Sequence, residues 1–145
     1  MDDIKAEGLM SRNVVSVNPG EPLSRVISLF HEKQISAIPV VVESNTLAGI
    51  ITKADVIAHA YSWGSQVISD TEATTGDEPV EEVAEWSRAL ARDVMSPVLV
   101  TASVDATPIE IVEIMKKNEI HHVPITSEGK LVGIVSTFDL LKLIP

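Results

Sequence analysis

The chain repeats itself, and this internal repeat constrains its fold more than any other feature of the sequence. The segment LMSRNVVSV at 9–17 resembles VMSPVLVTA at 94–102, at a distance of 85 residues. The same distance separates Pro39, in ISAIPV, from Pro124, in IHHVPI. Self-similarity at a fixed distance indicates that one structural unit occurs twice. Every motif must therefore be interpreted in both repeats.

A second pair of matching segments closes each repeat. GIITKAD begins at Gly49 and GIVSTFD begins at Gly133, after one residue is dropped in the preceding turn. Each segment has a glycine, two β-branched residues, a hydroxyl residue and, three positions later, an aspartate. An apolar run typical of a helix follows in both. These two segments are called the signatures of the repeats.

The apolar pattern predicts the same order of elements in both repeats, namely a short strand, a helix, two strands rich in Val and Ile, and a second helix. The predicted strands are 14–17, 37–42 and 46–51, then 98–101, 122–126 and 131–135, and the predicted closing helices are 53–62 and 137–143. Each repeat is thus a β-α-β-β-α unit. Such a unit, of about 50 residues, is too small to bury an apolar sheet face alone.

The sequence therefore predicts an α/β (α+β) fold of two pseudo-twofold-related β-α-β-β-α units packed through their sheets. The first unit is predicted at 1–62 and the second at 93–145. Between them, residues 63–92 do not repeat, and we expect an acidic insert, a loop followed by a helix. This insert carries seven acidic and two basic side chains, which is half of the net charge of −10.

Composition excludes several classes of function. The chain has no cysteine, so it cannot use disulfides, thiolate metal sites or thiol nucleophiles. It has no apolar run long enough for a membrane span, and MDDIKAEG lacks the features of a signal peptide, so we expect a cytoplasmic location without membrane contact. The 21 acidic against 11 basic side chains oppose binding to nucleic acid.

Taken together, the paired Met-Ser segments, the Ile38-Pro39-Val40 and Val123-Pro124-Ile125 strands and the two signatures resemble a tandem pair of cystathionine-β-synthase-type (CBS) domains, called a Bateman module. The resemblance implies regulation by binding, with AMP, ADP, ATP or S-adenosylmethionine in clefts between the units and no catalytic cofactor. It also implies a homodimer with four units and a regulated partner protein of unknown identity. The acidic insert departs from the family pattern.

The signatures admit two interpretations that are compatible. Thr52 with Asp55, and Ser136 with Asp139, fit a capping box, with a hydroxyl at the N-cap and an acid three residues later. A helix N-terminus also favours phosphate, a hydroxyl there can bond a phosphate oxygen, and an ionised aspartate can accept from ribose hydroxyls. The signature glycines allow close approach of a ligand or a neighbouring backbone, or mark a strand bulge.

The resemblance implies walls for an adenine ring in each cleft, although packing in the core explains each of these residues nearly as well. The implied wall residues are Ser16, Val17, Ile38 and Pro39 for one cleft, and Thr101, Ala102, Val123 and Pro124 for the other. Phosphate needs positive charge, and Lys53, inside the first signature, is the leading candidate. Thr137 takes the matching place in the second signature.

Arg12, His121 and His122 are secondary candidates for phosphate. Adjacent strand residues point to opposite faces, so the His121-His122 pair is not expected to chelate one metal ion. We expect instead that one histidine faces the ligand and the other faces solvent. No metal site is predicted.

Three classes of function follow from these observations. A sensor of an adenosine-containing ligand, with S-adenosylmethionine as the alternative to a nucleotide, best fits both signatures. A protein-interaction or dimerisation module that does not use the pocket is the second class. A nucleic-acid binder is disfavoured by charge and by few aromatic residues. An enzyme is not expected, because no nucleophile, base and orienting residue form a recognisable set.

Overall fold

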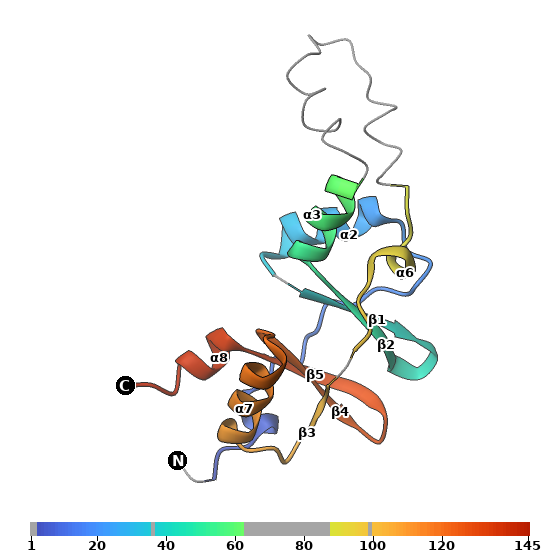
Figure 1. Ribbon diagram of the computed structural model, residues 1–145. Coiled ribbons are helices and arrows are strands. Elements are labelled where there is room, and N and C mark those ends of the chain that lie inside the picture. The colour runs from blue at the N-terminus through green and yellow to red at the C-terminus, as the bar shows by residue number, and fades with distance from the viewer. Residues whose placement is uncertain (1–2, 36, 63–87, 99) are drawn as a thin grey trace. The chain divides into compact units, whose positions relative to one another are not determined.

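The computed structural model describes residues 3–35, 37–62, 88–98 and 100–145 (Figure 1). Its contacts divide the chain into two compact units that differ from the sequence repeats. Unit 1 comprises Met1–Ser16, Val41–Ala48 and Val98–Pro145, and unit 2 comprises Val17–Val40 and Gly49–Pro97. Unit 1 therefore combines most of the second repeat with the N-terminal segment of the first.

Unit 1 contains a small sheet with helices packed against it. Its elements are α1 (Ala6–Leu9), β3 (Ala102–Ser103), α7 (Pro108–Asn118), β4 (His122–Ser127), β5 (Lys130–Ser136) and α8 (Thr137–Leu141). β4 pairs with β3 in parallel and with β5 in antiparallel orientation. The antiparallel register places His122 opposite Ser136. The start of β4 therefore lies beside the second signature.

The core of unit 1 is apolar and draws on several segments. Its buried members are Ala6, Met10, Ala102, Ala106, Ile111, Met115, Val123, Ile125 and Val135. β4 buries three consecutive residues, Val123 to Ile125, as a strand covered on both faces does. Helix α7 begins at a capping box, because Thr107 accepts from the Glu110 N–H at 3.2 Å and Glu110 accepts from the Thr107 N–H at 2.9 Å.

Unit 2 has the corresponding elements of the first repeat. They are α2 (Leu23–Lys33), the larger parts of β1 (Ala37–Val42) and β2 (Thr46–Thr52), and α3 (Lys53–Ser62). Unit 2 also contains α6 (Ala91–Val94), which lies outside the first repeat. The turn Glu43–Asn45 between β1 and β2 belongs to unit 1, where Thr46 pairs with Lys130 of β5. Leu23, Val26, Leu29 and Phe30 form the buried face of α2.

The predicted mixed α/β class with β-α-β-β-α units is confirmed, and four strands and both closing helices agree with their predicted ranges to within two residues. The prediction of the first strand in each repeat was wrong. In the second repeat the strand is Ala102–Ser103, and the described residues among 98–101 lie outside strands. In the first repeat only Val17 pairs, in parallel with Val40. β-branched residues also suit half-buried segments that do not pair with another strand. The clusters of these residues at 14–17 and 98–101 therefore led to the prediction of too many strand residues.

The insert helix was expected in the later part of residues 63–92, of which 63–87 lie outside the described residues and 88–90 are not helical. Beyond them the chain forms α6, a single turn whose Asp93 accepts from the Leu90 N–H at 2.9 Å. The predicted packing of the two repeats through their sheets stays a prediction.

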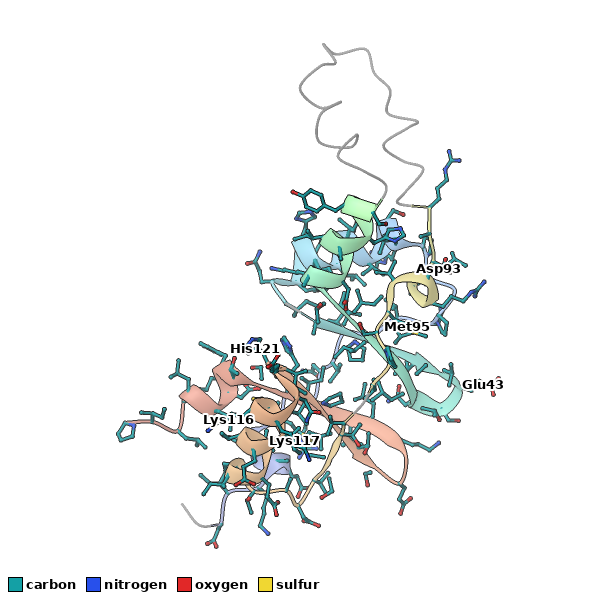
Figure 2. All side chains as sticks on the ribbon, viewed as in Figure 1. Glu43, Asp93, Met95, Lys116, Lys117 and His121 are labelled. Carbon is teal, nitrogen blue, oxygen red and sulfur yellow. The ribbon has the colours of Figure 1, made fainter. Side chains whose placement is uncertain are left out.

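Each Met-Ser segment packs against the signature strand of the other repeat. In unit 1, Ser11 exchanges two backbone hydrogen bonds with Ile134, at 2.9 and 3.2 Å. In unit 2, Ser96 exchanges two with Ile50, at 2.9 and 3.0 Å. Figure 2 shows the labelled Met95 beside β2. Both Met-Ser segments thus form a short strand-like bridge on a signature strand.

The two signature glycines make this approach possible. A Cβ atom at Gly133 would lie 2.9 Å from the Ser11 carbonyl oxygen, and one at Gly49 would lie 3.0 Å from the Ser96 carbonyl oxygen. Each would also meet the side chain of Met10 or Met95. Both glycines therefore allow the close approach of a neighbouring backbone. Gly133 also adjoins an irregularity in the β4–β5 pairing, because Ile125 pairs with Gly133 whereas Thr126 pairs with Leu131.

We predict that Gly133→Ala and Gly49→Ala each lower the free energy of unfolding by about 1–3 kcal/mol, because the new methyl group overpacks a backbone contact. Urea or thermal unfolding monitored by circular dichroism measures the change. Gly8→Ala is the matched control, since a Cβ there meets nothing within 4 Å. This control is expected to gain up to about 1 kcal/mol through helix propensity. Equal stability of all three variants would contradict the packing argument.

Candidate functional site

The first signature, in unit 2, forms a complete capping box at the start of α3. The Thr52 N–H donates to Asp55 Oδ2 at 2.8 Å, and the Asp55 N–H donates to Thr52 Oγ1 at 3.1 Å. The second carboxylate oxygen, Oδ1, accepts a hydrogen bond from the Ser96 hydroxyl at 3.2 Å. The capping interpretation is therefore confirmed here, and Asp55 Oδ1 meets a hydroxyl donor besides.

The second signature, in unit 1, forms the same box at the start of α8. Asp139 Oδ2 accepts from the Ser136 N–H at 2.8 Å and from the Ser136 hydroxyl at 3.1 Å. The Asp139 N–H donates back to Ser136 Oγ at 3.2 Å. Asp139 is only 9% exposed, and no other charged side chain among the described residues is buried.

Asp139 Oδ1 faces a different group from its counterpart in unit 2. The Lys142 ammonium lies 3.9 Å from Oδ1, and it also lies over the Phe138 ring, 5.1 Å from the centroid. In both signatures, therefore, one carboxylate oxygen completes the helix cap and the other meets a hydrogen-bond donor. An acceptor held in this way is suited to a ligand hydroxyl.

Six of the eight expected wall residues are buried rather than lining an open surface, and Ser16 and Thr101 are the exceptions. In unit 2, Ile38 and Pro39 are fully buried, and the Val17 N–H donates to the Pro39 carbonyl oxygen at 3.1 Å. The structure thus brings Val17 and Pro39 together. Ser16 is half-buried and is grouped with unit 1.

In unit 1, the four expected wall residues lie on adjacent strands or next to them. Val123 and Pro124 are buried on β4, and Ala102 pairs with Ile125 of the same strand. Thr101, which precedes β3, is exposed. Pro124 lies opposite Ile134 of the second signature. The wall residues and the signature are therefore neighbours within this unit.

The candidate cations differ in their surroundings. Lys53 is exposed at the first residue of α3. Arg12 is drawn to the N-terminal segment, where it donates to the Glu7 carbonyl oxygen at 3.2 Å and lies 3.9 Å from the Glu7 carboxylate. Thr137 begins α8, at the position that Lys53 has in the first signature. The Thr137 N–H donates to the His121 carbonyl oxygen at 3.1 Å.

The two histidines have unequal exposure. His121 is exposed and His122 is half-buried. Burial lowers the pKa of His122, the neighbouring His121 lowers it further, and Asp139 partly opposes both effects. His122 is thus favoured in its neutral form, close to the second signature. Among the described residues, no group of three His, Cys, Asp or Glu side chains is placed to hold a metal ion.

Two residues near the signatures were not predicted. Ser96 belongs to a repeated segment, but its contact with Asp55 depends on the packing of that segment against β2, which spacing alone does not reveal. Lys142 lies three residues after Asp139, a spacing at which helix side chains are neighbours, so this signal was present in the sequence.

With this geometry established, comparison with protein families identifies the chain. A model of the CBS domain matches residues 4–62 and 91–145, so the chain belongs to the CBS domain family and carries the predicted tandem pair. Within the described residues, no helix is both long and apolar enough to cross a membrane.

Curated relatives have low sequence identity to this chain, but they match nearly its whole length. An uncharacterised protein of Methanocaldococcus jannaschii is 26% identical over 144 residues, which are 99% of this chain and 32% of that protein. Hypoxic response protein 1 of Mycobacterium tuberculosis is 27% identical over 140 residues, which cover 97% of this chain and 85% of that protein. The chain therefore spans about a third of the first relative and most of the second.

Solved structures share the fold. The CBS domain of a CBS domain containing membrane protein from Sphaerobacter thermophilus has a TM-score of 0.80 and 29% identity, covering 99% of this chain and 90% of that chain. CBSX2, solved in complex with AMP, has a TM-score of 0.73 at 19% identity, with 96% and 94% covered. The CBS domain pair of protein MJ0100, solved with 5-methylthioadenosine and S-adenosyl-L-methionine, has a TM-score of 0.71 at 18% identity, with 97% and 94% covered.

The lowered pKa of His122 predicts a loss of stability in acid. The unfolded chain binds a proton at His122 near pH 6.5, whereas the folded chain binds it only at lower pH. Stability conferred by the neutral ring is therefore present above pH 6.5 and is lost as the pH falls toward the folded pKa. We expect the thermal midpoint of the natural chain to fall in this range more steeply than that of His122→Gln.

His121→Gln is the control for this measurement. Burial is the larger cause of the shift, so this variant should keep most of the acid-induced loss. If His122→Gln lost as much stability as the natural chain, the burial of a neutral ring would not be the cause.

Proposed function

We propose that this chain is a regulatory module that binds an adenosine-containing ligand at its signatures and transmits the binding to a partner protein. The observation that carries the proposal is the common geometry of Asp55 and Asp139. Each uses Oδ2 for the helix cap and directs Oδ1 at a hydrogen-bond donor from elsewhere in its unit or helix. A ribose hydroxyl is a donor of the same kind.

The ligand-bound relatives support the class of ligand. One neighbour in fold was solved with AMP and another with 5-methylthioadenosine and S-adenosyl-L-methionine. All three molecules share the adenosine skeleton and differ in what is attached to it. We therefore propose that the chain binds an adenosyl ligand without a catalytic step and without a catalytic cofactor.

The first signature is better suited to phosphate than the second. Lys53 begins a helix of 10 residues, where free N–H groups and the helix dipole favour an anion. In the second signature Thr137 takes its place, and α8 has only five residues. We propose that AMP, ADP or ATP binds at the first signature, through Thr52, Lys53 and Asp55.

The second signature favours a second candidate ligand. Ser136 and Asp139 are present, but the cation inside the signature is missing. An adenosyl ligand without phosphate, such as S-adenosylmethionine, therefore fits Ser136, Thr137 and Asp139 better than a nucleotide does. His122, held neutral close to this signature, is consistent with a ligand that lacks strong negative charge.

Regulation requires that the ligand favour one conformation over another, since equal affinity for both would shift nothing. We propose that the chain acts as a cytoplasmic homodimer, and that a regulated protein reads its state. An interaction module that binds no nucleotide is the alternative. Uniform absence of binding by AMP, ATP and S-adenosylmethionine in calorimetry would favour that alternative and reject the sensor.

The role of the aspartates is tested with a ligand that lacks one ribose hydroxyl. We expect the natural chain to bind AMP more tightly than 2′-deoxy-AMP by about tenfold, the value of one hydrogen bond to a charged group. In Asp55→Asn this preference should shrink, because the acceptor loses its charge. The ratio of the two affinities is the readout, so a general loss of folding does not imitate the effect.

Asp139→Asn is the comparison for the same measurement. If AMP binds at the first signature, this variant should keep the preference for AMP over 2′-deoxy-AMP. An unchanged preference in Asp55→Asn would contradict the assignment of Asp55 to the ribose.

The role of Lys53 is tested by removing the phosphate from the ligand. Lys53→Ala should weaken AMP binding by about tenfold, because a charge-assisted hydrogen bond is lost, and should leave adenosine binding unchanged. Lys33→Ala, which removes an exposed lysine of α2, is the control with the same change in net charge. Equal weakening of AMP in both variants would show that only the overall charge matters.

A further inference from the structure

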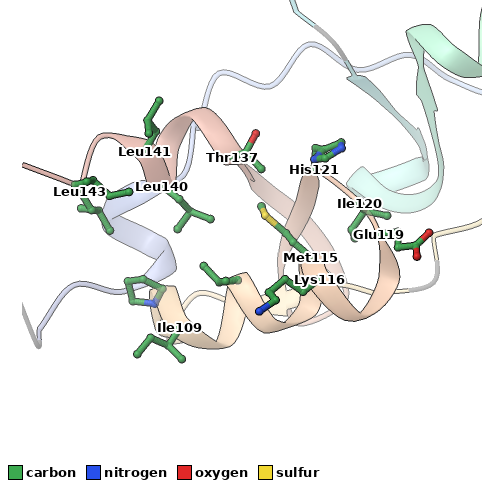
Figure 3. A pocket seen from close by; sticks show the side chains of 13 residues that line it. Ile109, Met115, Lys116, Glu119, Ile120, His121, Thr137, Leu140, Leu141 and Leu143 are labelled. Atoms are coloured by element: carbon green, nitrogen blue, oxygen red, sulfur yellow. The ribbon is translucent and has the colours of Figure 1, made fainter.

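The four methionines of the chain carry all of its sulfur, because the chain has no cysteine. The structure describes three of them. Met10 and Met115 are 8% and 6% exposed, whereas Met95 is half-buried. Figure 3 shows Met115 on α7, where it lines a pocket of unit 1 although it is buried. Among the described methionines, Met95 is therefore the one that a small reagent in solution reaches most easily.

The side chain of Met95 packs directly on the glycine of the first signature. A Cβ atom at Gly49 would lie 2.5 Å from Met95 Sδ and 3.0 Å from Met95 Cγ. The sulfur atom thus occupies the space that a side chain would take at this glycine. A thioether suits the position because it is apolar and polarisable. An oxygen atom on the sulfur makes the side chain wider and polar, which disfavours this packing.

The residue that follows Met95 connects this packing to the first signature. Ser96 exchanges two backbone hydrogen bonds with Ile50, at 2.9 and 3.0 Å, and Ile50 lies two residues before the cap residue Thr52. The Ser96 hydroxyl donates to Asp55 Oδ1 at 3.2 Å. Displacement of this Met-Ser segment would therefore remove a support of the signature strand. It would also remove the donor that orients the carboxylate proposed to contact the ribose.

Unit 1 contains the same packing in a shielded form. Met10 packs on Gly133, but it is a member of the buried core. Asp139 Oδ1 meets Lys142 of its own helix instead of a serine from the Met-Ser segment. The β-α-β-β-α unit therefore does not require an accessible methionine. The accessible one lies beside the candidate ligand carboxylate of the first signature.

We propose that Met95 is a site of reversible oxidation by hydrogen peroxide, and that its sulfoxide releases the Met-Ser segment and weakens ligand binding at the first signature. The release of the segment does not depend on a ligand. Its effect on binding rests on the proposed function.

The chemistry is a two-electron transfer of oxygen. The sulfur lone pair attacks one oxygen atom of the peroxide, an S–O bond forms and the O–O bond breaks. The proton of the transferred oxygen moves to the departing hydroxide, so one thioether and one peroxide give one sulfoxide and one water. Methionine sulfoxide reductases reverse the change. In that step two thiols become a disulfide, and the oxygen leaves as water.

The site is tested by exposing the natural chain to hydrogen peroxide and measuring the sulfoxide at each methionine by mass spectrometry of peptides. N-acetylmethionine amide in the same solution gives the rate of a fully accessible thioether. We expect Met95 to react about tenfold faster than Met10 or Met115, because susceptibility follows exposure. In concentrated guanidinium chloride the three rates should converge. Equal rates in the folded chain would overturn the proposal.

The release of the segment is measured as a fall in the thermal midpoint, followed by circular dichroism. Brief oxidation should lower the midpoint of the natural chain by about 3 °C or more. Reductases for both sulfoxide epimers should restore it. This arm needs no variant, so a midpoint that reduction does not restore would count against the proposal.

Two leucine variants assign the effect to one methionine. Met95→Leu changes the side-chain volume little, so it should fold and keep its midpoint in peroxide. Met10→Leu is the matched control from unit 1 and should lose as much as the natural chain. A Met95→Leu chain that loses stability in peroxide as the natural chain does would place the effect elsewhere and overturn the proposal.

Calorimetry with AMP separates this inference from the ligand proposal. Oxidation should weaken AMP binding to the natural chain by about fivefold or more and should not affect Met95→Leu. Ser96→Ala should weaken binding without peroxide, because it removes the hydroxyl from Asp55. Unchanged AMP affinity in an oxidised chain whose midpoint has fallen would overturn the link between Met95 and the signature. A natural chain that binds no adenosyl ligand but loses stability through Met95 would reject only the sensor.

Discussion

The close approach of a Met-Ser segment to a glycine on a signature strand is the contact on which each unit depends. Gly133 admits the backbone of Ser11, and Gly49 admits that of Ser96, each through a pair of backbone hydrogen bonds. Any side chain at these glycines would occupy the space of a carbonyl oxygen. Because each segment comes from the other repeat, neither β-α-β-β-α unit is complete within its own stretch of sequence.

This packing also shapes the candidate ligand sites. The segment that covers Gly49 brings the Ser96 hydroxyl to Asp55, three residues beyond the strand end. Ser11 occupies the corresponding place in unit 1, but Asp139 meets Lys142 of its own helix instead. The same backbone arrangement therefore leaves the two carboxylates with different partners, a neutral hydroxyl in one case and an ammonium in the other.

Much of the fold could be predicted from the sequence, because the strongest signals are local. The Thr107 and Ser136 caps, the strands with Pro39 and Pro124, and the closing helices all follow from patterns of a few residues. The exchange of the Met-Ser segments could not be predicted, since it joins residues such as Met10 and Gly133 that no short pattern connects. The wall residues show the same limit: burial of Ile38 reflects packing, which a resemblance does not specify.

The two repeats of one chain need not have the same function. The positions at which they differ are therefore as informative as the positions at which they agree. The backbone features that both repeats retain, the glycine and the capping aspartate, are those that packing requires of each unit. The features that differ lie where packing imposes little: Lys53 against Thr137 at the helix start, and Ser24 against Ile109 on the outer helix. Such differences at exposed positions change what each repeat can contact, whereas buried differences, such as Phe30 against Met115, exchange one apolar side chain for another, as a close-packed interior requires.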